Sequence, residues 1–176
     1  MTPMRHDLEV LMTERMAAVR ISESDFAELR RMDCDVRVMA TLGGIRSEAQ
    51  TSEFLLKAIQ HWHRYRYGIW IFRERDGQRF LGRAGLRHVE LEGTCEVELL
   101  YAVMAEFWGK GFATEMARAI VKLGFECLGL ESVVAFTLPA NFASRRVMEK
   151  AGFSYEREST WAATPHVLYR LKNPAR

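Results

Sequence analysis

The hydrophobic positions of this chain follow a helical period in some segments and a strand period in others. Apolar residues recur every three or four positions after Ser22 and again after Ser47. A serine followed by acidic residues and such a period predicts a helix that begins at a capping side chain. From residue 67 to residue 103 the pattern changes to three aromatic and β-branched runs, and Asp76-Gly77 stands in the first gap. These runs predict a meander of three antiparallel strands.

The second half of the chain predicts alternating strands and helices. A glycine pair, Gly109 and Gly111, separates the third meander strand from a helix expected over about residues 112–128. The following run, Glu131 to Leu138, is β-branched and almost continuously apolar, which is typical of a strand buried on both faces. Asn141 then provides an N-cap for another helix. Two closing strands are expected at residues 153–158 and 166–171.

A further strand is expected near residues 16–21, before the first helix. This order of elements predicts an α+β (mixed αβα) fold with a central, mostly antiparallel sheet of about seven strands. The third meander strand, the glycine turn, its helix and the apolar strand form a β-α-β crossover, so these two strands should be parallel. Ligands of such sheets tend to bind at the carboxyl ends of strands, where the strand order switches.

The glycine turn is the first candidate for a ligand site. The amides of the first helical turn have no intrahelical partner, and the helix dipole places positive partial charge at the same end. Glycines at positions 109 and 111 let the backbone approach a phosphate without a Cβ in the way. We therefore expect this turn to hold a phosphate-bearing ligand and the strand before it to carry the chemistry.

Composition narrows the class of protein further. The chain has 176 residues, of which 48% are hydrophobic, and it carries a formal net charge of +2, so we expect one domain over residues 1–176 and no nucleic-acid partner. No apolar run approaches the ~18 residues of a membrane span, and the N-terminus lacks the apolar stretch of a signal peptide. Three widely spaced cysteines favour reduced thiols over a disulfide or zinc framework. These features predict a cytoplasmic protein.

Four segments together resemble the GNAT N-acetyltransferase superfamily, and within it the RimJ/RimL-like branch of ribosomal-protein N-terminal acetyltransferases. They occur in the family's order and spacing, distributed over nearly the whole chain. Trp108 stands where the wider superfamily usually has Gln or Arg, and the RimJ/RimL-like branch often has Trp there. The segments are TERMAAVRI (13–21), FLGRAGL (80–86), ELLYAVMAEFWGKGFATE (98–115) and NFASRRVMEKAGF (141–153).

The resemblance implies acetyl-CoA as donor and a primary amine as acceptor. It places the pyrophosphate at the glycine turn and the pantetheine arm along the backbone of the preceding strand, in a slot where that strand splays from the next. Asn141 and Ser144 match the family positions that face the pantetheine and the thiol. The cofactor-binding residues expected on this basis are Tyr101, Ala102, Val103, Trp108, Gly109, Lys110, Gly111, Phe112, Ala113, Thr114, Asn141, Ser144 and Arg146, with Arg145 as an alternative to Arg146.

Amide formation from a thioester needs a group that accepts the proton of the amine and a group that stabilises the leaving thiolate. Glu98 matches the family's strand glutamate and is the expected base, directly or through water. Glu96 shares its parity along the strand and is the second choice. Ser144 is expected to donate a hydrogen bond to the thiolate. Plain alternatives are a solvent-facing strand carboxylate for Glu98 and an ordinary early-helix serine for Ser144.

An aromatic and basic patch, His61-Trp-His63-Arg-Tyr-Arg-Tyr, ends the second predicted helix. Two His side chains with i, i+2 spacing do not face each other on a helix, which argues against a metal site. We expect this patch to form one wall of the acceptor site, or a helix end with mixed packing.

The identity of the acceptor stays open at this stage. The branch resemblance favours a protein N-terminal α-amine. A small amine such as an aminoglycoside, a polyamine or an amino-acid-like compound is the alternative, and a non-catalytic module that binds acyl-CoA is a third possibility. The sequence is compatible with a monomer or a homodimer.

Overall fold

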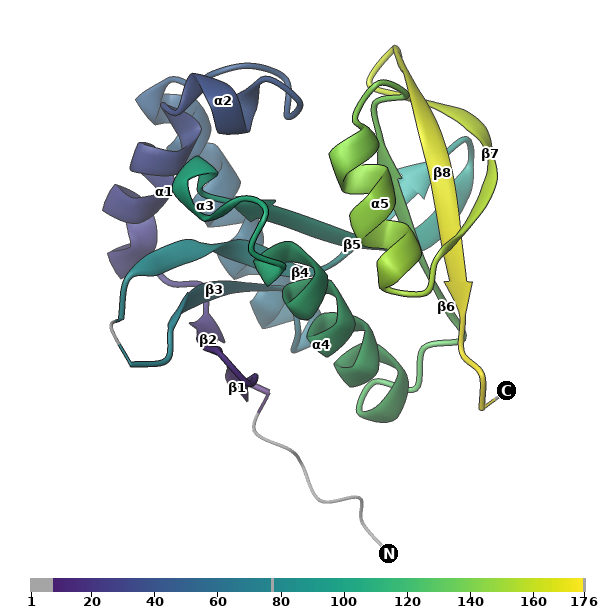
Figure 1. Cartoon of the computed structure of the whole chain (residues 1–176), viewed down its shortest axis with the longest axis horizontal. Coiled ribbons are helices and arrows are strands. Elements are labelled where there is room, and N and C mark those ends of the chain that lie inside the picture. The colour runs from purple at the N-terminus through teal and green to yellow at the C-terminus, as the bar shows by residue number, and fades with distance from the viewer. Residues whose placement is uncertain (1–7, 77, 176) are drawn as a thin grey trace, which may run out of the picture.

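The computed structural model describes residues 8–76 and 78–175. One mixed sheet of eight strands runs through the molecule in the order β1-β2-β3-β4-β5-β6-β8-β7 (Figure 1). Neighbouring strands are antiparallel except β5 and β6, which are parallel. The strands are β1 (Val10–Met12), β2 (Met16–Arg20), β3 (Ile69–Glu74), β4 (Phe80–Leu91), β5 (Thr94–Val103), β6 (Ser132–Thr137), β7 (Ser154–Trp161) and β8 (Thr164–Lys172).

This architecture confirms the predicted α+β class, the meander β3-β4-β5 and the parallel β-α-β crossover. The sheet has one strand more than expected. The additional strand, β1, has only three residues, and Val10 and Met12 at its ends are both half exposed, so it shows no buried face in the hydrophobic pattern. Asp76 lies in the turn between β3 and β4, whereas Gly77 lies outside the described residues.

Helices cover both faces of the sheet. Two of them, α4 and α5, lie in front of the strands in Figure 1, and the first three gather behind and beside β3 and β4. The helix α2 was not expected, because four residues are too few to show a period. The helices are α1 (Phe26–Asp33), α2 (Val36–Met39), α3 (Glu48–Tyr65), α4 (Phe112–Glu126) and α5 (Phe142–Lys150), and two short 3-10 turns lie at Glu23–Asp25 and Ala105–Phe107.

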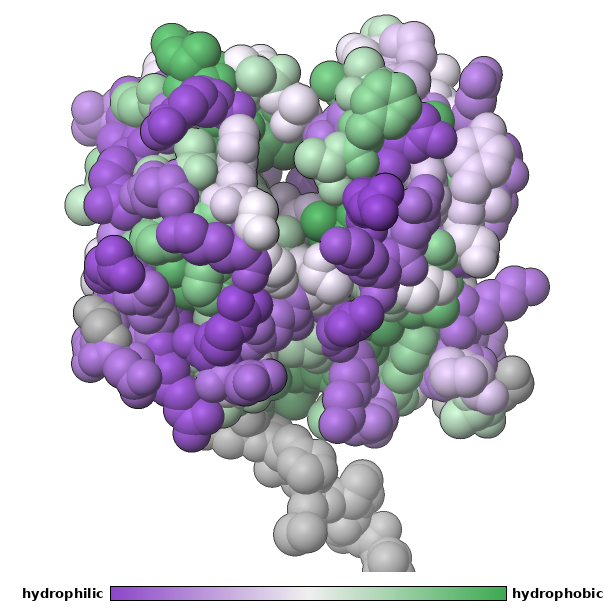
Figure 2. Space-filling model, in the orientation of Figure 1, coloured by the Kyte–Doolittle hydropathy of each residue, from purple (hydrophilic) through white to green (hydrophobic). Residues whose placement is uncertain are grey.

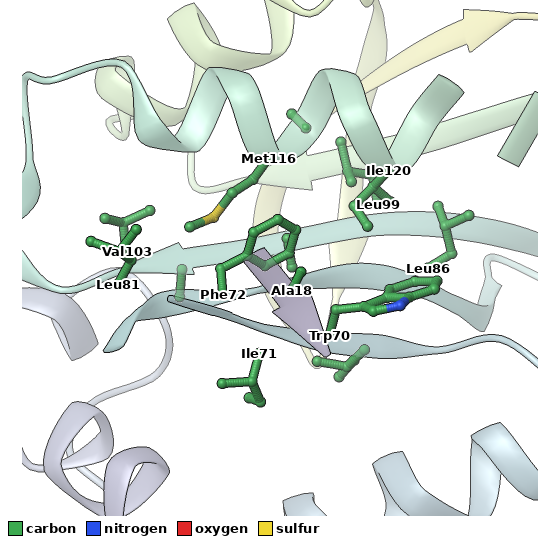
Figure 3. Close-up of a cluster of buried hydrophobic side chains, with 14 of the residues drawn as sticks. Ala18, Trp70, Ile71, Phe72, Leu81, Leu86, Leu99, Val103, Met116 and Ile120 are labelled. Carbon is green, nitrogen blue, oxygen red and sulfur yellow. The ribbon is translucent and has the colours of Figure 1, made fainter. Parts of the chain in front are cut away.

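The main core lies between α4 and the strands β2 to β5. Met116 and Ile120 on α4 point down onto Phe72, Trp70 and Leu99, as Figure 3 shows, and all five side chains are almost fully buried. Ile71 points to the opposite face, as alternation along a strand requires. The packing of both faces fixes the position of β5, on which the candidate site is built.

The caps predicted at Ser47 and Asn141 are confirmed, whereas Ser22 is the N-cap of the 3-10 turn Glu23–Asp25 that precedes α1. The Ser47 hydroxyl accepts a hydrogen bond from the amide of Gln50 and so begins α3. Among the described residues no helix is long and apolar enough to cross a bilayer.

Candidate functional site

The loop between β5 and α4 has the backbone conformation that its glycines allow. Gly109 and Gly111 have φ angles of +76° and +82°, in the left-handed region that favours glycine. Gly111 is the N-cap of α4, and no side chain caps that end of the helix. The first amides of α4 are therefore left for a ligand, as an anion site requires.

Two contacts hold this loop in place. The indole Nε1 of Trp108 donates a hydrogen bond to the carbonyl of Val103 at 2.8 Å, which ties the loop to the end of β5. On the other side, Nη1 of Arg15 donates to the carbonyl of Lys110 at 2.9 Å. The ammonium of Lys110 lies 5.3 Å from the centroid of the Phe107 ring. The loop is thus anchored at both of its ends.

A cavity of about 390 Å³ opens beside the start of α4. Its wall includes Thr114, which the sequence placed at the cofactor, and cations that sequence reasoning missed. Arg15 pairs with Glu115 at 2.7 Å, while Arg118 donates to the carbonyl of Lys150 at 2.7 Å. The full lining is Glu14, Arg15, Gly111, Thr114, Glu115, Arg118 and Lys150. Such a mixture of free amides and cations suits a phosphate group.

The strands β5 and β6 separate almost as soon as they meet. A single residue pair, Glu98 with Val134, joins them among the described residues. From Leu99 onward β5 is paired only with β4, so its other edge is open toward α5. Figure 2 shows a hollow between the two halves of the molecule on this face. The open edge includes Tyr101, Ala102 and Val103, although the Val103 carbonyl is already used by Trp108.

Two hydroxyl groups meet across this opening. The Tyr101 hydroxyl on β5 lies 2.8 Å from Oγ of Ser144 on α5 and also donates to the Ser144 carbonyl at 3.0 Å. Burial raises the pKa of Tyr101 to about 12, and the hydrogen bond with Ser144 opposes this rise. Tyr101 is therefore protonated at neutral pH. Because its one proton is directed to the Ser144 carbonyl, the Ser144 hydroxyl donates to the Tyr101 oxygen.

The start of α5 shows the ordinary capping role of Asn141. Its Oδ1 accepts from the amide of Ser144 at 3.1 Å, and its Nδ2 donates to the Thr137 hydroxyl at 3.0 Å. Arg145 donates to the Tyr169 hydroxyl at 3.0 Å, whereas Arg146 is exposed. Of these two arginines, Arg146 thus keeps the freer side chain.

Glu98 is buried, with 5% of its surface exposed, and pairs with Nε of Arg87 at 2.5 Å. Burial raises the pKa of Glu98, and Arg87 opposes the rise. Glu96, the second choice, forms a bidentate ion pair with Arg170 at 2.7 Å and 3.0 Å. Deeper burial and one hydrogen bond from its cation, in place of two, distinguish Glu98 from Glu96. Its raised pKa suits a group that must both accept and release a proton.

The residues predicted for catalysis lie on opposite faces of β5. Alternation along the strand places the Glu98 side chain on one face and the Tyr101 side chain on the other. Ser144 therefore meets Tyr101 and not Glu98. The splayed slot lies between the two groups, so a ligand threaded through it would have a carboxylate on one side and hydroxyls on the other.

The predicted aromatic and basic patch is an ordered cluster at the end of α3. Nδ1 of His61 lies 2.8 Å from the Tyr67 carbonyl, and the Tyr67 hydroxyl lies 2.8 Å from Nε2 of His88. The rings of Tyr65 and His88 stack with centroids 4.1 Å apart. Burial lowers the pKa of both histidines. In the described part of the chain, no group of three or more His, Cys, Asp or Glu side chains is placed to hold a metal ion.

Comparison with known proteins decides the family. A family model described as an acetyltransferase (GNAT) domain matches residues 15–154, a range that contains β5, the glycine loop, α4 and α5. The chain belongs to the GNAT acetyltransferase family. This confirms the resemblance drawn from the sequence and makes the protein an N-acetyltransferase by family.

Individual relatives agree over almost the full length. The uncharacterized protein YkkB of Bacillus subtilis (strain 168) is 29% identical over 164 residues, which cover 93% of this chain and 95% of that protein. Among solved structures, an acetyltransferase from Agrobacterium tumefaciens str. C58 superposes with a TM-score of 0.82 at 24% identity and covers 92% of this chain and 93% of its own. The fold of this chain is therefore the GNAT fold.

A second solved neighbour shares the fold. The ribosomal L7/L12 alpha-N-protein acetyltransferase RimL, in complex with coenzyme A, superposes with a TM-score of 0.79 at 14% identity, over 96% of this chain and 100% of its own. At that identity the likeness concerns the fold.

Proposed function

We propose that this protein acetylates a primary amine with acetyl-CoA as donor, in a complex that holds both substrates at once. The observation that carries the proposal is the open edge of β5, which leads directly into the uncapped start of α4. The amides from Gly109 to Ala113 would hold the pyrophosphate, with Lys110 and Thr114 beside them. The backbone of Tyr101 would pair with the pantetheine arm like an added strand. The glycine cradle fits this ligand because a side chain there would be strained and would block the amides.

Glu98 is proposed as the base. The neutral amine attacks the thioester carbon, a C–N bond forms and the C–S bond breaks. Glu98 accepts the proton that the amine nitrogen loses, directly or through a water molecule. Arg87 keeps the carboxylate oriented and favours its ionised form, while burial works in the opposite direction.

Ser144 is proposed to donate a hydrogen bond to the departing thiolate, and Tyr101 orients it. The Ser144 hydroxyl lies 2.8 Å from that of Tyr101 and would turn its proton from the Tyr101 oxygen to the sulfur. A serine is too weak an acid for full proton transfer, but a fixed donor still stabilises the charge that develops on sulfur. Asn141 fixes the first turn of α5 and so positions Ser144.

The proposed acceptor is a protein N-terminal α-amine. RimL, which acts on such an amine by its description, shares the fold. The charge on the α1–α3 face of the sheet also disfavours a polycation, because Arg83 has no ion-pair partner there among the described residues. The cations of Arg46 and Arg87 are balanced by Asp33 and Glu98. An aminoglycoside or a polyamine would meet repulsion at this face. An amino-acid-like compound remains the alternative that the charge permits.

Incubation of a proteome and a metabolite extract with isotope-labelled acetyl-CoA, followed by mass spectrometry, tests both parts of the proposal. We expect label on α-amines of protein N-termini. Label confined to small amines would replace the proposed acceptor. Binding of CoA without release of thiol in any extract would instead indicate a non-catalytic acyl-CoA module.

A further inference from the structure

A buried arginine without a counter-charge lies on the α1–α3 face of the sheet. Arg83 occupies the middle of β4 and has 4% of its surface exposed. Its guanidinium lies over the Phe54 ring of α3, with 4.0 Å between the guanidinium carbon and the ring centroid. The buried Nε has no hydrogen-bond partner. Within residues 8–76 and 78–175, neither a hydrogen bond nor an ion pair involves this side chain.

The surroundings of Arg83 carry an excess of positive charge. The charge of Asp33, which is 1% exposed, acts favourably on Arg83, but this carboxylate is already used by Arg46 at 3.3 Å and by the Thr51 hydroxyl at 2.9 Å. Arg46 lies over the same Phe54 ring at 5.1 Å. Two guanidiniums thus share one carboxylate. Burial, reinforced by repulsion from Arg46, lowers the pKa of Arg83 to about 9.

A purely structural role does not explain this side chain. A buried cation is costly unless it is paired, and a well-packed apolar residue usually fills such a position at lower cost. The contact with Phe54 offsets only a part of that cost. Arg87, four residues along the same strand, shows the usual solution, because it has Glu98 as its partner. The missing partner of Arg83 is therefore expected to come from a ligand.

The position of Arg83 relates it to the acceptor. Arg83 and Arg87 point to the same face of β4 and lie opposite Ala102 and Glu98 on β5. Four residues of strand separate the two arginines by roughly 13 Å. Arg46 is the member of this pair that solvent reaches, since 24% of its side chain is exposed. An anion bound by Arg83 and Arg46 would thus lie well away from an amine at Glu98.

We propose that the acceptor carries a carboxylate that binds Arg83 and Arg46 while its amine reacts beside Glu98. This inference rests on the proposed function and adds a substrate class to it. An extended peptide advances about 3.3 Å per residue, so the separation fits an acidic side chain among the first four residues of a protein N-terminus. The α-carboxylate of a free amino acid is one carbon from its amine and is too close.

Matched peptides on the unaltered protein provide the first test. Tetrapeptides with Asp at position 2, 3 or 4 are compared with the same peptides carrying Asn, in turnover with acetyl-CoA and in calorimetric binding with CoA present. We expect the best Asp peptide to exceed its Asn partner about tenfold or more, mainly through KM and Kd. Equal constants for all pairs would overturn the carboxylate proposal and leave the proposed function intact.

Free aspartate and glutamate, each beside its side-chain amide, form a second arm of the test. Selective acetylation of the free acids over all peptides would mean that the carboxylate comes from a small molecule, which would overturn the peptide source. Absence of thiol release with every acceptor, together with equal binding of Asp and Asn peptides, would overturn the proposed function and this inference together.

The variant Arg83→Met tests the residue itself. We expect it to reduce the Asp-to-Asn ratio to about one, whereas Arg31→Met should keep the ratio. Arg31 is a matched control because its guanidinium also lies over an aromatic ring, Phe80, but it is exposed on α1. A retained ratio in Arg83→Met would overturn the assignment. Should Arg83→Met fail to fold, Arg46→Met gives the same measurement, with a partial reduction of the ratio expected.

Discussion

At the scale of single residues, β5 shows how neighbouring carboxylates acquire different chemistry from their partners. Glu96 and Glu98 point to the same face, yet Glu96 is held by two hydrogen bonds from Arg170 and Glu98 by one from Arg87. Glu98 is also the more buried of the two. Burial destabilises the ionised form and so raises the pKa of Glu98. The environment, and not the residue type, separates a candidate base from an ion-pair partner.

Glu98→Gln should lower turnover by about 10²–10⁴-fold near pH 7. The loss should shrink as the pH rises past the α-amine pKa of about 8, because more of the amine is then already neutral. Turnover of the unaltered protein should fall on the acid side, since protonation of Glu98 removes the base. The measurement is kcat/KM from pH 6 to pH 10, with Glu96→Gln as the matched control. A loss of equal size at every pH would assign Glu98 a positioning role.

Ser144→Ala should slow thiol release about two- to tenfold, the amount expected for one hydrogen bond. The fold should be unaffected, because the Tyr101 hydroxyl keeps its bond to the Ser144 carbonyl. Release is followed with a thiol-reactive dye in single-turnover mixing. Ser154→Ala, at an exposed serine, is the control. Rates equal to those of the unaltered protein would remove Ser144 from the mechanism.

At the scale of elements, the unit of β5, its glycine loop and α4 combines local and distant determinants. The sequence alone predicts the strand, the turn and the helix, because each depends on nearby residues. The anchoring by Arg15 is different, since this residue lies beside the loop only through the pairing of β2 with β3. Long-range contacts of this kind leave no periodic signal in the sequence.

Gly111→Glu should weaken CoA binding by about tenfold or more. The φ angle of +82° strains any side chain there, and the new carboxylate would place negative charge where a phosphate is expected. Isothermal titration calorimetry measures the affinity for CoA. Gly93→Glu is the matched control, because Gly93 has a similar φ angle of +81° in the β4–β5 turn. An unchanged Kd in Gly111→Glu would exclude the loop as the pyrophosphate site.

Glu115→Gln should lower the free energy of unfolding by about 1 kcal/mol at pH 7. Partial burial raises the pKa of Glu115, but hydrogen bonds from Thr13 and Arg15 outweigh it and hold the pKa below its usual value. The contribution is therefore present above the unfolded pKa of about 4.3 and is lost as the pH falls below it. Urea unfolding at pH 7 and pH 3 should show the difference disappearing in acid. Glu126→Gln, on the exposed side of α4, should be neutral at both pH values.

The difference between local and long-range contacts also explains which parts of the site the sequence predicts. Arg87 could have been paired with Glu98 by counting outward from the Glu92-Gly93 turn, where the two form the fifth pair of the hairpin. The lack of an ion-pair partner for Arg83 in the described part of the chain could not have been predicted from the sequence, because it depends on how α1 and α3 cover β4. The contact between Tyr101 and Ser144 likewise requires knowing how far α5 stands from β5.

At the scale of the whole molecule, the sheet is nearly divided in two. One part contains β1 to β5 with α1 to α4, the other contains β6 to β8 with α5, and Figure 1 shows the gap between them. Within the part of the chain that the structure describes, the pair of Glu98 and Val134 alone continues the sheet across it. A ligand in the slot would thus replace the strand pairing that the fold itself omits.

A bridging ligand should stabilise the protein more than its contacts with either half alone. CoA at 100 times its Kd should add about 2.7 kcal/mol to the free energy of unfolding, or roughly 5–10 °C in Tm for a chain of this size. Differential scanning fluorimetry measures the shift, and Gly111→Glu at the same CoA concentration should lose about half of it or more, in line with its weaker binding. A shift of equal size in Gly111→Glu would mean that CoA is bound elsewhere.

The hydrogen bond from Trp108 to Val103 has an optical consequence. Trp108 is 52% exposed, whereas Trp62 and Trp70 are buried at 3% and 0% and Trp161 is partly covered. Emission at the red edge of the tryptophan spectrum therefore comes mainly from the indole that borders the proposed cofactor slot. Pantetheine that competed for the Val103 carbonyl would change the polarity around this indole. Cofactor binding should therefore change the red-edge tryptophan emission of the unlabelled protein, and Trp108→Phe should abolish that change.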